Sequence, residues 1–177
     1  MRKTIGTFFI VIYAIIAMAV TILLLSYNEY LCSEIGGYTF YIVPDENLEP
    51  NYEKGDLLII KQVKSNKVEI GDRIFLYRNI SKSEFEVYNG EVTDKIEYAN
   101  HFIYTLDNQY QFDSTYLIGV EDGSMAFHNL GTILAILESR WGYLFCIVIV
   151  TLLIFLEECY ELFIEIKYGN ETSEQRG

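Results

Sequence analysis

The chain has 177 residues, 51% of them hydrophobic, and its 25 acidic against 13 basic residues give a formal net charge of −12. An acidic surface repels phosphate groups, which argues against nucleic acid and anionic lipid headgroups as partners. The three cysteines lack the spacing of a metal site, and we expect no cofactor.

The first predicted element is a transmembrane helix over residues 4–26, an uncharged run directly behind Arg2 and Lys3. A helix of that length crosses ~30 Å of hydrocarbon and satisfies its own backbone hydrogen bonds. A cleaved signal peptide is the competing interpretation, but its apolar core of ~7–15 residues should end at a small-x-small site. Here the run leads into residues 27–30, Tyr-Asn-Glu-Tyr, so we expect a permanent anchor.

A second apolar stretch predicts another transmembrane helix over residues 141–158. The alternative, a buried core helix, would need a larger soluble domain around it. Basic residues near the first span place residues 1–3 in the cytoplasm, residues 27–140 outside the cell membrane and the acidic tail, 159–177, back in the cytoplasm. An impermeant thiol reagent is then expected to reach Cys32 and not Cys159.

The region between the spans is predicted to be mainly β, a curved antiparallel sheet or partial barrel. Short segments rich in β-branched and aromatic residues predict strands, and Asn89-Gly90 predicts a two-residue hairpin turn. One helix is expected over residues 133–139. The predicted strands are 38–43, 57–63, 74–77, 85–88, 92–96, 101–106 and 116–120.

Two Gly-Asp pairs, Gly55-Asp56 and Gly71-Asp72, stand 16 residues apart, each before a strand. Taken singly, each is interpreted as a turn in which Gly supplies an unusual backbone conformation and Asp caps the turn.

In order along the chain, the landmarks resemble type I signal peptidases, in the membrane-embedded branch of endoplasmic-reticulum, archaeal and sporulating-bacterial enzymes. That family has an S-G-S-M-E-P box after the first span, two G-D pairs, V-T-H-R-I, a stretch ending in Asp, and V-x-G and L-G segments before a final span. The corresponding segments here are Asp45–Pro50, Gly55–Leu57, Ile70–Asp72, Val92–Ile96, Thr105–Asp113, Ile118–Val120 and Leu130–Gly142.

The resemblance implies a β-rich catalytic domain on the outer membrane face, but the chain departs from the family at the catalytic positions. Asn47 stands where the family has its nucleophilic Ser, and an amide cannot form an acyl-enzyme. Asp94 replaces the His that acts as general base. The family's orienting Asp corresponds to Asp113, with Asp107 as the alternative register. We therefore expect no active catalytic residue, and expect Asn47, Asp94 and one of these two aspartates to meet in space.

Other interpretations of these residues remain. Gly123-Ser124-Met125 resembles the lost box and offers a relocated nucleophile, but it lies far along the chain and no Glu-Pro follows. Asn47, Asp94 and Asp113 together offer oxygen ligands for Ca²⁺, although their spacing matches no known loop. His101 and His128 are more simply explained as surface or turn residues.

The favoured hypothesis is a signal-peptidase-like pseudoenzyme of the plasma membrane that binds extended secreted polypeptides and assists their processing or surface assembly. An exposed strand edge provides main-chain hydrogen bonds for such a partner, and the resemblance places Ile42, Val43 and Pro44 beside it. By resemblance, its partners include an active signal peptidase, a sortase or a pilin. The alternatives are an active peptidase with an unorthodox nucleophile and an acidic membrane scaffold subunit.

Overall fold

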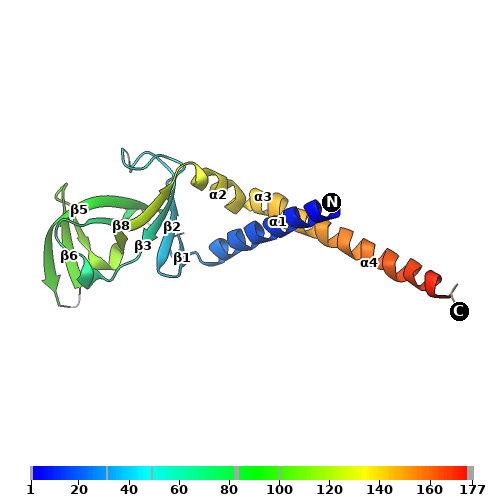
Figure 1. Cartoon of the computed structure of the whole chain (residues 1–177). Helices are drawn as coiled ribbons and strands as arrows, with labels where there is room; N and C mark the ends of the chain where they lie inside the picture. Colours follow the sequence, from blue (N-terminus) through cyan, green and yellow to red (C-terminus); the bar gives the residue numbers. More distant parts are fainter. Residues whose placement is uncertain (1, 31, 49, 82–83, 100, 175–177) are drawn as a thin grey trace. The chain divides into compact units, whose positions relative to one another are not determined.

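The computed structural model describes residues 2–30, 32–48, 50–81, 84–99 and 101–174. The chain divides into two units, Met1–Ala135 and Ile136–Gly177, and each is described by itself. Figure 1 labels their helices and strands in chain order. The first unit holds α1 (Arg2–Leu25), eight strands, two short 3-10 helices, η1 (Ser65–Lys67) and η2 (Ser114–Tyr116), and most of α2 (Leu130–Glu138).

In the described part of the chain the strands form one open antiparallel sheet, in the order β1-β2-β3-β8-β4-β5-β6-β7. This confirms the expected mainly β, antiparallel architecture. The strands are β1 (Ser33–Ile35), β2 (Tyr38–Ile42), β3 (Leu57–Lys61), β4 (Arg73–Ser81), β5 (Glu84–Tyr98), β6 (His101–Leu106), β7 (Gln111–Asp113) and β8 (Leu117–Phe127).

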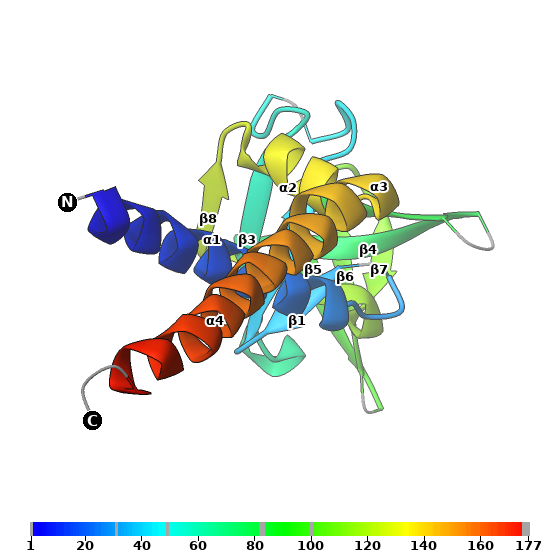
Figure 2. The ribbon, with the colours of Figure 1, turned by 90° about the vertical axis from the view of Figure 1, so that its right-hand side faces the viewer.

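The sheet carries a hydrophobic core on each of its two faces, and β4 contributes to both. Successive side chains of a strand point to opposite faces. Phe75 and Tyr77 pack in one cluster, while Ile74 and Leu76 pack in the other. The first cluster is completed by Cys32, Val43, Leu48, Leu58, Ile60, Val87 and Ile118, and the second by Val68, Val92, Tyr104 and Leu106. Figure 2 shows the strands of this unit from a second direction.

The two Gly-Asp pairs form the same turn, which explains their repetition. Gly55 and Gly71 have φ angles of 90° and 96°, a conformation that side-chain-bearing residues rarely adopt. In each turn, the Asp carboxylate accepts a hydrogen bond from the backbone N–H of the residue three positions earlier, Glu53 or Glu69. Each turn also pairs with one valine, because Val43 N–H donates to the Asp56 carbonyl and Val92 N–H to the Asp72 carbonyl.

The expected hairpin at Asn89-Gly90 is wrong. β5 runs straight through both residues, which pair with Phe75 and Ile74 of β4. A β-carbon on Gly90 would lie 3.0 Å from the Leu106 side chain, so the glycine makes room for the core and does not form a turn. A two-glycine turn does occur earlier, where Gly36 and Gly37, at φ 61° and 84°, join β1 to β2.

The second unit is helical, with α3 (Arg140–Gly142), a π-helical segment, η3 (Tyr143–Ile149), and α4 (Val150–Glu174). Ser139 caps α3 by accepting a hydrogen bond from Gly142 N–H at 3.0 Å. α4 continues without interruption beyond residue 158, where the sequence predicted the end of the second span.

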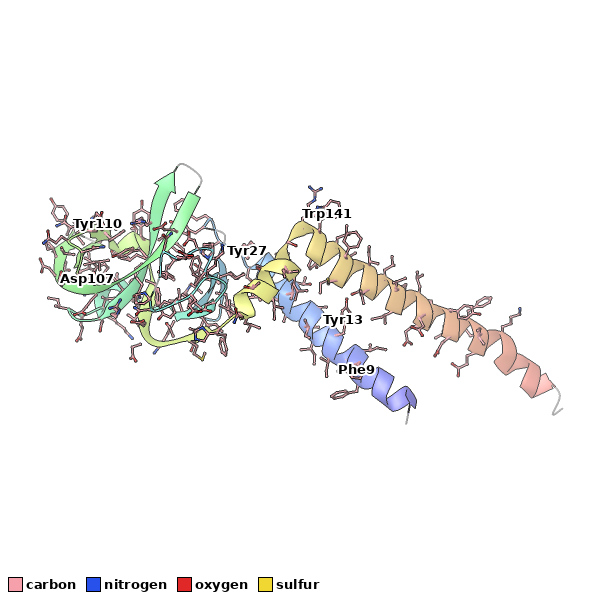
Figure 3. The ribbon with its side chains drawn as sticks, turned by 90° about the horizontal axis from the view of Figure 1, so that it is seen from above. Phe9, Tyr13, Tyr27, Asp107, Tyr110 and Trp141 are labelled. Carbon is pink, nitrogen blue, oxygen red and sulfur yellow. The ribbon has the colours of Figure 1, made fainter. Side chains whose placement is uncertain are left out.

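Two helical segments, Gly6–Leu25 and Arg140–Lys167, are long and apolar enough to cross a membrane. Only 6% of the most apolar 18-residue window of each segment is buried, so neither segment packs as a core helix in the described part of this chain. Figure 3 shows side chains extending outward along α1, among them Phe9 and Tyr13. Exposed apolar side chains on a helix of this length are typical of a segment that faces lipid.

Candidate functional site

Asn47, which the sequence resemblance aligned with a nucleophilic Ser, lies in the loop between β2 and β3. Its side-chain amide donates a hydrogen bond of 3.0 Å to Oε2 of Glu86. Glu86 is only 6% exposed and is also paired with the guanidinium of Arg78. Buried Leu48 anchors the loop in the core beside it. The amide of Asn47 therefore compensates a buried carboxylate and leaves position 47 without a nucleophile.

Asp94, which the sequence resemblance aligned with a general base, lies on β5 opposite Thr105 of β6. It is exposed, and its carboxylate accepts a hydrogen bond of 2.9 Å from the N–H of Lys95. The Lys95 ammonium is turned toward the Val68 carbonyl, 2.6 Å away. This arrangement stabilises the local strand and holds no second catalytic group at Asp94.

The two candidate orienting aspartates both have structural roles at turns. Asp113 caps η2 by accepting from Thr115 N–H at 2.8 Å, and its second oxygen lies 3.3 Å from Nε2 of His101. The Thr115 N–H bond outweighs the opposing effect of burial, and with help from His101 it lowers the pKa of Asp113. Asp107 begins the β6–β7 turn and accepts from the N–H of Asn108 at 3.0 Å.

Asn47, Asp94 and Asp113 each have a different hydrogen-bond partner. Asn47 binds Glu86, Asp94 binds its neighbour, and Asp113 binds η2 and His101. Across the described ranges no hydrogen bond or ion pair joins any two of the three, and the same holds for Asp107. Nor do the described residues contain a group of three or more His, Cys, Asp or Glu side chains placed to hold a metal ion.

Ser124, the candidate relocated nucleophile, is part of a bulge in β8. The register between β3 and β8 shifts there, from Ile59 opposite Met125 to Lys61 opposite Val120. The Ser124 hydroxyl donates to the Val120 carbonyl at 2.6 Å and accepts from Lys61 N–H at 2.9 Å. The hydroxyl replaces backbone ladder bonds that the bulge removes. Ser124 therefore has a structural role in β8, which accounts for its presence in Gly123-Ser124-Met125.

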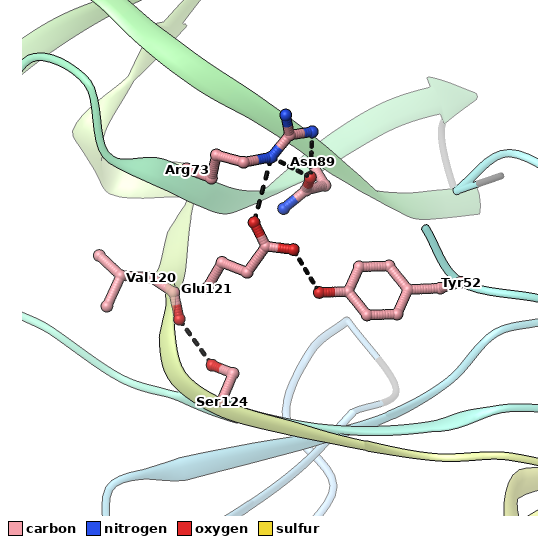
Figure 4. A network of polar contacts seen from close by, with 6 residues as sticks. All are labelled: Tyr52, Arg73, Asn89, Val120, Glu121 and Ser124. Carbon is pink, nitrogen blue, oxygen red and sulfur yellow. Dashed lines mark hydrogen bonds and ion pairs between the residues drawn. The ribbon is translucent and has the colours of Figure 1, made fainter. Parts of the chain in front are cut away.

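The same bulge directs Glu121 into the polar network of Figure 4. One carboxylate oxygen of Glu121 accepts from the Tyr52 hydroxyl at 2.5 Å, and the other lies 3.1 Å from Nε of Arg73. The Arg73 guanidinium also donates to the Asn89 side-chain oxygen at 2.9 Å. Burial, followed by the Glu121 carboxylate, raises the pKa of Tyr52, so the phenol stays protonated. The network fastens the loop before β3 to the bulge.

The hydrogen bonds of β3 define which of its residues face each neighbouring strand. Val43 N–H donates to the Asp56 carbonyl, and Gln62 N–H donates to the Gly37 carbonyl, both at 2.9 Å. Backbone groups in an antiparallel pair alternate between the two sides of a strand. The even-numbered residues of β3 therefore face β2, and its odd-numbered residues face β8.

It follows that β8 has an open edge near its end. Leu57 and Ile59 direct their backbone groups to Phe127 and Met125, so the intervening Ala126 directs its N–H and C=O away from β3. In the described chain β8 pairs with β4 only through residues 117–120. Met125 and Phe127 are also 50% and 42% exposed. Among the described residues Ala126 thus presents an unpaired donor and acceptor, the feature of an edge strand that can accept another strand.

The predicted substrate-strand residues lie at the end of β2 and directly after it. Val43 is buried in the core, and both its backbone groups are bonded to the first Gly-Asp turn, at 2.9 Å to Gly55 and to Asp56. Ile42 closes the register of β2 opposite Leu57, and Pro44 is exposed without an N–H to donate. Ile42 is therefore the one of the three that retains a strand position.

His128 and His101 each pair with an aspartate. Nδ1 of His128 lies 3.1 Å from the buried carboxylate of Asp56, which also accepts from the N–H groups of Glu53 and Asn129. Burial acts to raise the pKa of Asp56, but these donors outweigh it and lower the pKa. Sequence reasoning also missed Glu86, Glu121 and Ala126. No local signal marked Glu86, because successive residues of a strand point to opposite faces and an inward Val87 predicts an outward Glu86.

Searches of family models, curated proteins and solved structures find no match to this chain.

Proposed function

We propose that the chain is a membrane-anchored, signal-peptidase-like pseudoenzyme that binds extended polypeptide without cutting it. The open edge at Ala126 is the observation that carries this proposal. An unfolded segment can add itself to such an edge as a further strand, gaining main-chain hydrogen bonds that do not depend on its sequence.

The contacts of Asn47 and Ser124 support the proposal that the protein does not cleave the polypeptide. The Asn47 amide has no ionisable hydroxyl, and it is bound to Glu86, which is itself paired with Arg78. The Ser124 hydroxyl, required by the alternative of an active peptidase, has its donor and acceptor engaged in the bulge. An activated nucleophile needs a base that can take its proton, and Ser124 donates to a carbonyl instead.

We further propose that the two apolar helices cross the plasma membrane, with both termini in the cytoplasm and the sheet outside. Arg2 and Lys3 precede the first span, and basic residues favour the cytoplasmic side. The sheet would then meet secreted chains as they leave the membrane. This placement also suits partners such as an active signal peptidase, a sortase or a pilin.

The scaffold alternative draws support from α4. Beyond residue 156 the helix carries Glu157, Glu161 and Glu165 at intervals of four residues, which places them on one face. Leu162 and Phe163 are 61% and 63% exposed. This helix could hold a partner subunit independently of the sheet.

Binding to the open edge is tested with a labelled synthetic peptide that alternates Val and Lys. Such a peptide favours an extended conformation and has the charge opposite to that of the protein. Ala126→Pro removes the outward N–H and leaves the β3 ladder intact, whereas Ala126→Val keeps that N–H. We expect Ala126→Pro to weaken binding roughly three- to tenfold, the value of one hydrogen bond, and Ala126→Val to bind like the unmodified protein.

Equal affinity of the Pro and Val variants would exclude this edge as the binding site. If neutralising Glu157, Glu161 and Glu165 removes partners from the purified complex while Ala126→Pro retains them, the scaffold function is favoured.

A further inference from the structure

The second half of β5 has a neighbouring strand on one side only. β5 pairs with β4 through residues 84–91, and Val92 is bonded to the second Gly-Asp turn through both of its backbone groups. From residue 94 to residue 98, β5 pairs only with β6 in the described chain. This end of β5 is therefore an edge strand.

Lys95 and Glu97 direct their backbone groups to the open side of β5. On β6, Phe102 N–H donates at 2.9 Å to the hydroxyl of Ser114, which follows β7, so the backbone groups of Phe102 face away from β5. Backbone groups alternate along a strand, so those of Tyr104 also face away from β5. Glu97 lies opposite Phe102, and two residues before it Lys95 lies opposite Tyr104. Because opposite residues of an antiparallel pair face either toward each other or both outward, Lys95 and Glu97 face outward.

The open side of β5 is exposed and carries charges of both signs. Ile96 is 44% exposed and Tyr98 is 64% exposed, and Asp94 and Glu97 are exposed as well. The side chains of Lys95 and Glu97 lie on one face of the strand, and those of the other three residues lie on the opposite face. Residues 94–98, with the sequence Asp-Lys-Ile-Glu-Tyr, are called the β5 edge below.

We propose that the β5 edge pairs antiparallel with the β5 edge of a second copy of this chain, around a two-fold axis at Ile96. Lys95 of each copy then lies opposite Glu97 of the other, and each such pair exchanges both of its backbone hydrogen bonds. The two Ile96 side chains meet at the axis. Asp94 lies opposite Tyr98, whose hydroxyl can donate to the carboxylate. This contact uses a different edge from that at Ala126 and does not depend on the proposed function.

The charges of the β5 edge select this register. Outward-facing residues must lie opposite outward-facing residues, so the two-fold axis could also fall at Lys95 or at Glu97. An axis at Lys95 would place two ammonium groups opposite each other, and an axis at Glu97 would do the same with two carboxylates. Like charges directly opposite are destabilising, whereas an axis at Ile96 pairs opposite charges twice. A second copy is therefore the occupant that the β5 edge fits.

The hydrogen bonds now made by the β5 edge allow this pairing. The Lys95 ammonium donates to the carbonyls of Val68 and Asn66, at 2.6 Å and 3.4 Å, and its third N–H remains for Glu97 of the second copy. The Lys95 backbone N–H donates to the adjacent Asp94 carboxylate at 2.9 Å. That carboxylate has to turn away, and Tyr98 of the second copy offers it a replacement hydrogen bond. Pairing therefore exchanges a local bond for bonds between copies.

The test traps the paired state as a disulfide in the full-length protein in detergent. Cys146→Ala and Cys159→Ala remove the two exposed thiols, and Cys32 is kept because it is buried. Ile96→Cys places a thiol at the axis, where opposite residues that exchange no hydrogen bonds lie close enough for a disulfide. Tyr98→Cys is the matched control on the same face of the same strand. Its two thiols would be separated by about four residues of strand, or ~13 Å.

Under mild oxidation by copper phenanthroline in air, we expect at least threefold more disulfide-linked dimer from Ile96→Cys than from Tyr98→Cys on a non-reducing gel. Random collision would favour Tyr98→Cys instead, because position 98 is more exposed. Added to Ile96→Cys, Glu97→Lys places like charges opposite each other in both pairs and should lower the yield of dimer roughly threefold or more. Glu46→Lys makes the same change in net charge outside β5 and should change the yield little.

Equal yields from Ile96→Cys and Tyr98→Cys would overturn the inference, and so would equal yields from Glu97→Lys and Glu46→Lys in the Ile96→Cys background. A peptide that alternates Val and Lys and carries one Cys tests the other occupant. If Ile96→Cys forms more disulfide with this peptide than with a second copy at equal concentration, the β5 edge accepts unrelated polypeptide, which also overturns the inference. Failure of peptide binding at Ala126 would leave all these outcomes unchanged, so the two proposals fail separately.

Discussion

The side-chain amide of Asn47 donates a 3.0 Å hydrogen bond to the carboxylate of Glu86, a residue buried on β5 and paired with Arg78. A buried carboxylate is costly unless its oxygens are satisfied. Asn47, which the sequence resemblance aligned with a nucleophilic Ser, therefore contributes to the stability of the domain. The chain uses this position for structure.

Removal of the Asn47 amide is expected to destabilise the domain. Asn47→Ala leaves Glu86 with Arg78 as its remaining partner, and the loss of one hydrogen bond to a charged group corresponds to ~1–2 kcal/mol of unfolding free energy. Glu46→Ala, at the adjacent exposed position, is the matched control and is expected to change little. Denaturant unfolding in detergent measures both. Equal effects of the two substitutions would contradict the role assigned to Asn47.

The two Gly-Asp turns are expected to differ in their sensitivity to substitution. Asp56→Asn weakens the turn and also the bonds to His128 and Asn129 in a buried place, for a cost of ~1–3 kcal/mol. Asp72→Asn changes the same turn hydrogen bond, but its carboxylate is partly exposed, so we expect a smaller loss of unfolding free energy. Thermal unfolding measures the stability of both variants. A larger loss of stability for Asp72→Asn than for Asp56→Asn would contradict this prediction.

The lowered pKa of Asp56 also predicts a pH dependence. A carboxylate with a lower pKa in the folded than in the unfolded state stabilises the fold above the unfolded pKa of ~3.9. That stabilisation is lost as the pH falls through the folded value. The free energy of unfolding should therefore differ less between pH 6 and strongly acidic pH in Asp56→Asn than in the unmodified protein. An unchanged difference would show that Asp56 is not bound as described.

Alkaline pH is expected to destabilise the second core through Tyr104. This residue is fully buried, and its hydroxyl donates to the Ser65 carbonyl at 2.8 Å. Burial, assisted by Asp113, raises the pKa of Tyr104 to about 12. A raised pKa stabilises the fold fully below the unfolded value of ~10 and progressively less up to the folded value. Tyr104→Phe should lessen the decline in stability over that interval, as followed by circular dichroism.

Thiol labelling tests the topology, but Cys32, the probe that the sequence favoured, is unsuitable because it is buried. Cys32 is only 4% exposed, and its burial raises the pKa of the thiol to about 11, so it should react only after unfolding on either side of a membrane. Asn66→Cys introduces an exposed thiol on η1. An impermeant reagent applied to intact cells should label this thiol and leave Cys159 unlabelled. Labelling of Cys159 alone would reverse the proposed orientation.

Most strands were predictable because their signal is local. Alternating β-branched and aromatic residues marked β2, β3, β4 and β6, and two long uncharged runs marked the apolar helices. Asn89-Gly90 misled because the same dipeptide that favours a turn also fits a strand where Leu106 leaves no room for a side chain. β1 and β7, of three residues each, are too short to produce a periodic pattern.

The candidate site was less predictable because its contacts join distant parts of the chain. Nothing near Asn47 in the sequence indicates Glu86, 39 residues later, as its partner. The bulge that occupies the Ser124 hydroxyl depends on a register shift between β3 and β8, which only pairing of the two strands creates. Short motifs in the right order therefore located the loop and the turns, but they did not predict which side chains meet.

The most direct test of the pseudoenzyme account is a cleavage assay with the full-length protein in detergent and a secretory preprotein as substrate. The account predicts no cleavage by the unmodified protein. Asn47→Ser is expected to remain inactive as well, because the group that binds the side chain at position 47 is Glu86, whose carboxylate is paired with Arg78 and is not an imidazole base. Cleavage by the unmodified protein that is lost in Asn47→Ala or in Ser124→Ala would contradict the account.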